Sequence, residues 1–312
     1  MPDHVDSSVL WFVVGLYGLL VFSSLLLLPL KRKLQEKAYQ ELALRIRSWW
    51  IMVTVFSGAM LLSRTISICF FGLLSFLALK EFLSMIPTRR ADRRVLLWCY
   101  LAIPGQYYWV ASEWYGMFII FIPVYLFLFL PFSMIRIGET RNFLQAAGTL
   151  HWGTMTMVFS ISHVAFLLTM PKTEIMHAGG AGLVLYLVFL TQINDIAQFC
   201  WGKLLGKRKI VPTVSPNKTW EGFIGGVITT SLLALLAGQF LVGMPMWALL
   251  FTGALISAAG FVGDVTISAL KRDIGVKDSG SMLPGHGGIL DRLDSLTYSA
   301  PLFFHFIWYM YY

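Results

Sequence analysis

Long apolar stretches constrain the fold of this chain more than any other feature of its sequence. They recur along its whole length, and most approach the roughly 17 to 25 residues that a helix needs to cross the hydrocarbon core of a bilayer. Because lipid offers no partners to backbone N–H and C=O groups, such stretches cross a membrane as helices. A content of 57% hydrophobic and 13% charged residues agrees with a membrane protein. The predicted spans are 9–30, 49–63, 66–84, 95–111, 115–132, 150–170, 178–199, 222–242, 246–268 and 294–312.

These spans predict an all-α fold, a polytopic integral membrane helical bundle of about ten transmembrane helices. The first span is not expected to be a cleaved signal peptide, because Asp3 and Asp6 precede it where a basic region is expected and its apolar run is too long. We divide the bundle into an amino-terminal hydrophobic helical region, 1–148, and a carboxy-terminal catalytic membrane region, 149–312. Both regions are expected to form one integrated bundle.

The distribution of Lys and Arg predicts the orientation of the bundle. When the loops between predicted spans are assigned alternately to two sides, only Arg64 and Lys172 of the 24 Lys and Arg residues fall on one side. Cytoplasmic loops carry the excess of cations, so the crowded side should face the cytoplasm and both chain ends should face outward. This predicts a protein of the bacterial inner (plasma) membrane with a cytoplasmic active site. The net charge of +8 therefore reflects topology, and its spread over several loops argues against nucleic-acid binding.

The basic stretch 31–50 has two interpretations. Its pattern is that of an amphipathic helix at the inner leaflet, where anionic lipid collects. The alternative is a simple anchor that obeys the same bias of cations toward the cytoplasm.

The first of two polar loops runs from 194 to 226. Asp195 lies near the inner end of a span, where a carboxylate needs a cation or a wet cavity. Hydroxyl and ammonium groups just ahead of a helix, together with the free N–H groups of its first turn, suit a phosphate. The alternative is an ordinary capping segment in which Pro216 and Thr219 start the helix. The candidate phosphate-binding residues are Ser215, Lys218 and Thr219.

The second polar loop begins within an apolar span at Asp264, where an unpaired carboxylate would be costly. Further along, Asp291 and Asp294 are three residues apart and share one face if a helix has begun there. Their charges would repel unless a divalent cation or Arg292 lies between them. The remaining polar residues of this loop are Lys271, Arg272, Lys277, Asp278 and the PGHGG segment at 284–288.

Carboxylate oxygens without a Cys or His cluster favour Mg²⁺ among the common metal ions. His286 is a candidate ligand, but within PGHGG it better suits contact with a phosphate or a base. Gly287 and Gly288 allow the backbone to approach an anion closely. Together the loops predict a site for a nucleoside triphosphate and Mg²⁺ at the cytoplasmic mouth of the bundle, suited to phosphoryl or nucleotidyl transfer. The base and the acceptor stay open at this point.

The pattern S-A-L-K-R-x4-K-D-S-G-x2-L-P-G-H-G-G-I-L-D-R-L-D at 268–294 resembles that of the phosphatidate cytidylyltransferases. The upstream segments N-D-I-A-x-F-x-x-G-x-x-x-G-K and S-P-x-K-T-W-E-G-F-I-G-G are also similar to that family, and the resemblance covers roughly residues 190–296. The amino-terminal half resembles the family only as a hydrophobic bundle. Ile267 departs from the pattern, because many bacterial members carry an acidic residue there.

The resemblance implies a reaction of CTP with phosphatidate that gives CDP-diacylglycerol and pyrophosphate. The acceptor phosphate is already anionic at neutral pH, so no strong general base is needed. The implied Mg²⁺ ligands are first Asp264 and Asp291, then Asp195 and Asp294. Cations that would neutralise triphosphate or lipid phosphate are Lys218, Lys271, Arg272 and Lys277. Asp278 and Arg292 would orient those groups.

Two other classes of function stay open from the sequence. A transporter would place broken helices and ionisable residues near the midplane in related halves, whereas the charges here cluster at one interface. A CTP-dependent kinase of a lipid alcohol would release CDP and a phosphorylated lipid. The expected partners are CTP, an anionic lipid such as phosphatidate and the surrounding membrane lipids, and a homodimer is one candidate assembly.

Overall fold

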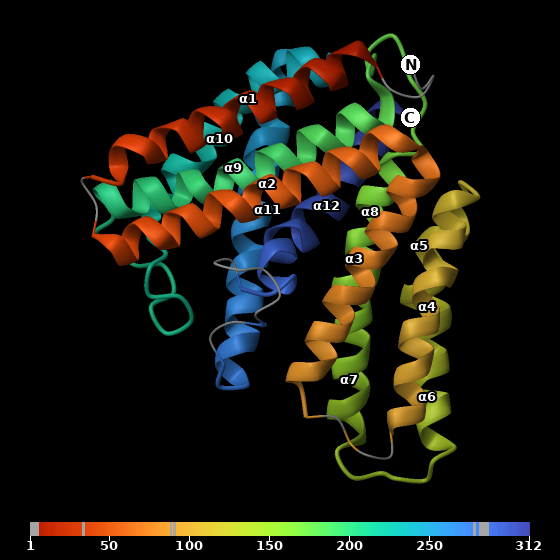
Figure 1. Cartoon of the computed structure of the whole chain (residues 1–312). Helices are drawn as coiled ribbons and strands as arrows, with labels where there is room; N and C mark the ends of the chain where they lie inside the picture. Colours follow the sequence, from red (N-terminus) through yellow and green to blue (C-terminus); the bar gives the residue numbers. More distant parts are fainter. Residues whose placement is uncertain (1–5, 33–34, 88, 90–91, 277–278, 281–286) are drawn as a thin grey trace.

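The computed structural model describes residues 6–32, 35–87, 89, 92–276, 279–280 and 287–312, and in these ranges the regular elements are helices. The all-α prediction is therefore confirmed for the described residues (Figure 1). Each predicted span overlaps one continuous helical segment, two of which contain a π-helical turn. The elements are α1 (Ser7–Leu30), α2 (Glu36–Leu62), α3 (Arg64–Met85), α4 (Arg93–Ala111), α5 (Tyr115–Ile120), η2 (Phe121–Leu126), α6 (Phe127–Ile135), α7 (Phe143–Thr154), η3 (Met155–Phe159), α8 (Ser160–Leu167), α9 (Gly179–Leu205), α10 (Trp220–Leu241), α11 (Met246–Asp273) and α12 (Leu290–Tyr311).

Six of the described helical segments are long and apolar enough to cross a membrane. Many of their apolar side chains face outward, as Trp11 and Phe22 do on α1, and such a surface suits contact with lipid. The chain is thus an integral membrane protein, but the figure of about ten spans is not confirmed by this criterion. The six segments are Ser7–Pro29, Arg64–Met85, Tyr115–Ile135, Gly179–Leu205, Trp220–Leu241 and Met246–Asp273.

The basic stretch at 31–50 does not form a helix of its own. Residues 36–50 are the first half of α2, which continues without interruption to Leu62 and includes the predicted span 49–63. The apolar second half extends a helix that the charged first half has already begun, so hydropathy alone placed its start too late. The predicted boundary between regions at 148 and 149 falls within α7 and stays a prediction.

Both described chain ends lie at the same end of the molecule (Figure 1). Lys172 forms an ion pair with Asp6 over 3.5 Å, and the Tyr312 hydroxyl donates a 2.7 Å hydrogen bond to the carbonyl of Pro171. The segment around 171–172 therefore holds both ends together. This grouping agrees with the alternation of loops that the cation count predicted.

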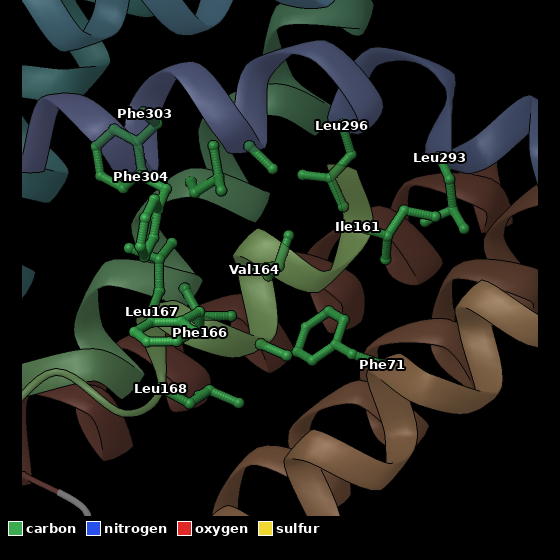
Figure 2. Packing of buried hydrophobic residues seen from close by; sticks show 14 of the residues in the cluster. Phe71, Ile161, Val164, Phe166, Leu167, Leu168, Leu293, Leu296, Phe303 and Phe304 are labelled. Atoms are coloured by element: carbon green, nitrogen blue, oxygen red, sulfur yellow. The ribbon is translucent and has the colours of Figure 1, made fainter. Parts of the chain in front are cut away.

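Helix α12 lies between two groups of helices. It packs on α11 and α9 on one side and on α8 and α3 on the other. Figure 2 shows Phe303 and Phe304 of α12 beside α8, with Phe71 of α3 below, and each of these rings is at most 1% exposed. Inside a membrane such contacts stabilise by dense van der Waals packing, because lipid tails are as apolar as the core. Helix α12 is thereby packed against both groups of helices.

Candidate active site

Three carboxylates converge where α9, α11 and α12 meet. Asp195, Asp264 and Asp294 come one from each helix, and they lie close enough for their negative charges to act on one another. The Ser295 hydroxyl donates to both carboxylate oxygens of Asp195, over 3.0 and 3.2 Å, and so fixes α9 against α12. The structure therefore brings together three of the four predicted metal ligands.

Two cations accompany these three carboxylates. Lys218 Nζ lies 2.5 Å from Asp264 Oδ2 and donates a 3.1 Å hydrogen bond to Gln198 Oε1. The positive charge of Arg292 acts on both Asp195 and Asp294. If all three carboxylates are ionised, the cluster holds more negative than positive charge in a largely buried place. Such an excess is stabilised by proton uptake or by a further cation.

Small residues allow the helices to approach this closely. A Cβ at Gly263 on α11 would lie 2.3 Å from the carbonyl oxygen of Asp294 on α12. A Cβ at Gly226 on α10 would lie 2.4 Å from the side chain of Gln198 on α9. Any larger residue would force these helices apart, as at other close helix contacts in membranes. The glycines of the sequence motifs thus act here through packing.

A buried amide links α9, α10 and α11 beside the cluster. Asn194 Oδ1 accepts hydrogen bonds from Gln198 over 3.1 Å, Thr230 over 3.3 Å and Ser257 over 2.5 Å, which places α9, α10 and α11 around one oxygen. Asn194 is 0% exposed. Because Gln198 also accepts from Lys218, this network determines where the ammonium lies. Sequence analysis missed Gln198 and Ser295, whose small polar groups carry no charge to mark them.

Lys271 and Asp291 form a second ion pair beside the cluster. Their side chains are 12% and 9% exposed and meet over 2.6 Å. Asp291 Oδ2 also accepts the backbone N–H groups of Ser279 and Gly288, each over 3.1 Å. Burial raises the pKa of Asp291, but the Lys271 ammonium and these two N–H groups lower it by more, so the pKa lies below its usual value. The carboxylate is therefore ionised at neutral pH, and both of its oxygens are occupied. Its predicted role as a metal ligand would require Lys271 to be displaced and stays a prediction.

A carboxylate from the amino-terminal half reaches the same loop. Glu81 of α3 accepts the backbone N–H groups of Ile289 over 2.9 Å and of Leu290 over 3.4 Å. Sequence analysis missed Glu81 because it assigned this residue only to an apolar span. An acidic residue inside such a span is itself the indication that could have found it.

The loop before α10 caps that helix. The Thr219 hydroxyl accepts the N–H of Gly222 over 3.1 Å, so the capping interpretation is confirmed for this residue. The helix begins at Trp220 rather than at Pro216, which lies in the preceding turn. In that turn Ser215 accepts the N–H of Lys218 over 3.2 Å through its carbonyl. Whether Ser215 and Thr219 also contact a phosphate stays a prediction.

The remaining predicted residues lie around this centre. Arg272 Nε donates to the carbonyl of Val214 over 3.2 Å and so joins the two polar loops. Gly287 has a φ of +80°, which favours glycine, and a Cβ there would lie 2.6 Å from Asp291 Oδ2. Ile267 is 0% exposed, so its departure from the family pattern places an apolar side chain in the core. The predicted residues Lys277, Asp278 and His286 lie outside the described part of the chain.

The donor set agrees with Mg²⁺ in chemistry, although the described residues contain no group of three acidic, His or Cys side chains arranged closely enough to hold a metal ion by themselves. Magnesium sites for phosphate chemistry commonly use one or two carboxylates, with water and substrate oxygens as the other ligands. Asp195, Asp264 and Asp294 supply such oxygens beside an excess of negative charge. The arrangement thus fits a metal that binds together with a phosphate.

Comparison with known proteins assigns the chain to a family. The family model described as "Cytidylyltransferase family" matches residues 43–310. The chain belongs to this family. The match begins within α2 and ends within α12, so it includes far more of the amino-terminal half than the motifs do.

Several curated relatives are similar over most of their length. An Escherichia coli protein described as uncharacterized protein YnbB is 45% identical over 294 residues, or 94% of this chain and 96% of the relative. A phosphatidate cytidylyltransferase of Staphylococcus saprophyticus is 32% identical over 263 residues, or 81% of this chain and 94% of the relative. One of Staphylococcus aureus is 32% identical over 262 residues, with the same shares.

Proposed function

We propose that this protein is a phosphatidate cytidylyltransferase, which transfers CMP from CTP to phosphatidate and releases pyrophosphate. The observation that carries the proposal is the cluster of Asp195, Asp264 and Asp294 with Lys218 and Arg292. This cluster is built from the motif segments of a cytidylyltransferase family, and curated relatives of the chain are named for this activity. A lipid-alcohol kinase or a transporter has no comparable support.

The reaction requires little proton chemistry. A phosphatidate oxygen attacks the α-phosphorus of CTP, a new P–O bond forms, and the bond from that phosphorus to the bridging oxygen of pyrophosphate breaks. The main requirement is alignment of the two phosphates and compensation of charge on the leaving group. Lys218 suits this role, because its ammonium can exchange Asp264 for a phosphate oxygen while Gln198 retains it.

We include Mg²⁺ in the proposal, held by oxygens of Asp195, Asp264 and Asp294. When bound, the ion would neutralise phosphate charge and polarise the reacting phosphorus. Arg292 would limit repulsion among these carboxylates before substrate arrives. Arg272 lies in the last turn of α11, where it suits the outer phosphates or the lipid phosphate, and Lys271 of the same turn would have to leave Asp291 to do so.

We also propose about ten membrane spans, an inner-membrane location and a site that faces the cytoplasm, where CTP is available. The support is the contact of the 171–172 segment with both chain ends, together with the excess of Lys and Arg in the loops assigned to the other side. Single cysteines placed at 200–220, in a variant without Cys69, Cys99 and Cys200, should resist an impermeant thiol reagent in intact cells. Labelling of that loop from outside would contradict this orientation. The homodimer stays a prediction.

Product analysis tests the activity directly. Purified protein in lipid nanodiscs, given labelled CTP and phosphatidate, is expected to form CDP-diacylglycerol and pyrophosphate in equal amounts. In a parallel reaction with a lipid alcohol in place of phosphatidate, phosphorylated lipid with CDP would identify a kinase instead. Failure to form either product, with correctly folded protein, would overturn the proposal.

A further inference from the structure

Glu81 occupies an unusual position for a residue of the amino-terminal half. It lies four residues before the end of α3 and is 9% exposed. Its carboxylate is placed against the turn that begins α12, which is more than 200 residues away in the chain. Helices α3 and α12 are far apart in the chain but pack against each other.

The described ends of the motif loop lie close against this carboxylate. A Cβ at Gly288 would lie 1.7 Å from Glu81 Oε1, so no side chain fits there. A Cβ at Gly280 would lie 3.3 Å from the Glu81 carboxyl carbon. Glu81 is thus in contact with both ends of the loop, the segment at 279–280 and the segment at 287–290.

Two carboxylates hold the backbone of these two loop ends. Asp291 accepts the N–H groups of Ser279 and Gly288. Glu81 accepts the N–H groups of Ile289 and Leu290. The first N–H groups of a helix have no partner within it, and the end of the helix carries partial positive charge. A buried carboxylate at this place is therefore stabilised by α12, and it fixes the direction in which α12 starts.

We propose that Glu81 is a positioning residue for the transfer reaction, an inference that rests on the proposed function. It holds the first turn of α12, which carries Asp291, Arg292 and, one turn later, Asp294. A small rotation of that turn would move all three side chains relative to Asp195 and Asp264. The amino-terminal half then forms part of the catalytic machinery rather than only a membrane anchor.

Substitution of Glu81 tests this role. In Glu81→Ala both acceptors are lost, and we expect kcat per folded molecule to fall about 100-fold, the effect of misplacing reacting groups by about 1 Å. Glu81→Gln keeps the shape and one oxygen acceptor and should lose less. Hydrogen exchange at the amides of Ile289 and Leu290 should accelerate in Glu81→Ala, and this readout does not depend on activity.

Ser63→Ala is the matched control, because it removes the cap at the other end of α3, where the Ser63 hydroxyl accepts the N–H of Ile66 over 3.1 Å. Its kcat should stay within about twofold of the natural protein, since Ser63 lies at the far end of the helix from the site. A purely structural role of Glu81 would lower the yield of folded protein and leave kcat per folded molecule unchanged.

Each outcome bears on the proposal. Natural turnover in folded Glu81→Ala, or unchanged exchange at the two amides, would overturn it. If Glu81→Ala does not fold, Glu81→Gln carries the test, and natural kcat in that variant would overturn the proposal. If the natural protein forms no CDP-diacylglycerol, the proposed function fails, while the exchange measurement still decides whether Glu81 holds the loop.

Discussion

The two ion pairs of the site have nearly equal lengths but different surroundings. Lys218 and Asp264 meet over 2.5 Å beside an excess of carboxylates, and the second contact of Lys218 is the neutral amide of Gln198. Lys271 and Asp291 Oδ1 meet over 2.6 Å, and the other carboxylate oxygen, Oδ2, accepts two backbone N–H groups. The other oxygen of Asp264 accepts the Ser268 hydroxyl over 3.3 Å, a longer contact than those of Asp291, so we expect the first pair to exchange with a phosphate more readily than the second.

We propose that this difference separates a reactive pair from a structural one. Breaking a buried pair leaves an uncompensated charge in a largely buried place. Opening the first pair leaves Asp264 among other groups that can rearrange around a metal or a substrate. We therefore expect substitutions in the second pair to act mainly on stability, and those in the first mainly on catalysis.

The largest effect is expected from Asp291→Ala. The variant leaves the Lys271 ammonium buried without its partner and should lose about 3 to 5 kcal/mol of stability. Denaturant or thermal unfolding in detergent would measure the loss. The double variant Lys271→Met/Asp291→Ala should regain much of it, because the isolated charge is gone. A single variant as stable as the natural protein would show that this pair is not structural.

Asp264→Asn should act in the opposite way. It removes one negative charge from a cluster with more carboxylates than cations, so the free energy of unfolding should change by less than about 1 kcal/mol. Turnover should fall about 100- to 1,000-fold, because positioned charge at the reacting phosphates is lost. The assay is CDP-diacylglycerol formation at saturating Mg²⁺. Near-natural turnover would remove Asp264 from the candidate ligands.

Lys218→Ala should show a smaller, specific effect on substrate. Loss of one charge-assisted hydrogen bond to a phosphate corresponds to about a tenfold rise in the KM for CTP. The KM for phosphatidate should change less. Unchanged dependence on CTP would support a purely structural role of the segment before α10.

The smallest effect concerns pH. Because the pKa of Asp291 lies below its usual value in the folded protein, its ionised form contributes stability that is fully present above about pH 4. That contribution is lost as the pH falls through the lower pKa of the folded state. The stability difference between the natural protein and Asp291→Asn should therefore be constant from about pH 5 to 8 and shrink in stronger acid. A difference that grows on acidification would contradict this assignment.

Most of the helical fold could be predicted because hydropathy is a local property. Each predicted span overlaps a helix, and the alternation of loops agrees with the contact between Asp6 and Lys172. The start of α2 could not be located in this way, because its first half is charged and its continuity depends on backbone geometry. Helices α2 and α12, which carry charged residues in their first turns, are not among the six segments that meet the length and hydropathy criterion.

The site could be predicted as a set of residues but not as an arrangement. Acidic residues in apolar surroundings revealed Asp195 and Asp264, and spacing on a helix linked Asp291 to Asp294. The sequence did not reveal that Asp291 forms an ion pair with Lys271, whereas Asp294 lies in the cluster with Asp195 and Asp264. The contact of Glu81 with α12 depends on packing across most of the chain, which no local pattern contains.

The buried amide of Asn194 has a consequence for how the protein enters the membrane. Helix α9 is synthesised before the residues that satisfy this side chain, because Thr230 lies in α10 and Ser257 in α11. Until they arrive, α9 would expose Asn194 and Asp195 to lipid at an energetic cost. The helix is therefore expected to stay beside the insertion machinery or the earlier helices until α11 has been made. Helices α9, α10 and α11 are then expected to assemble together in the membrane after α11 has been made, rather than one by one.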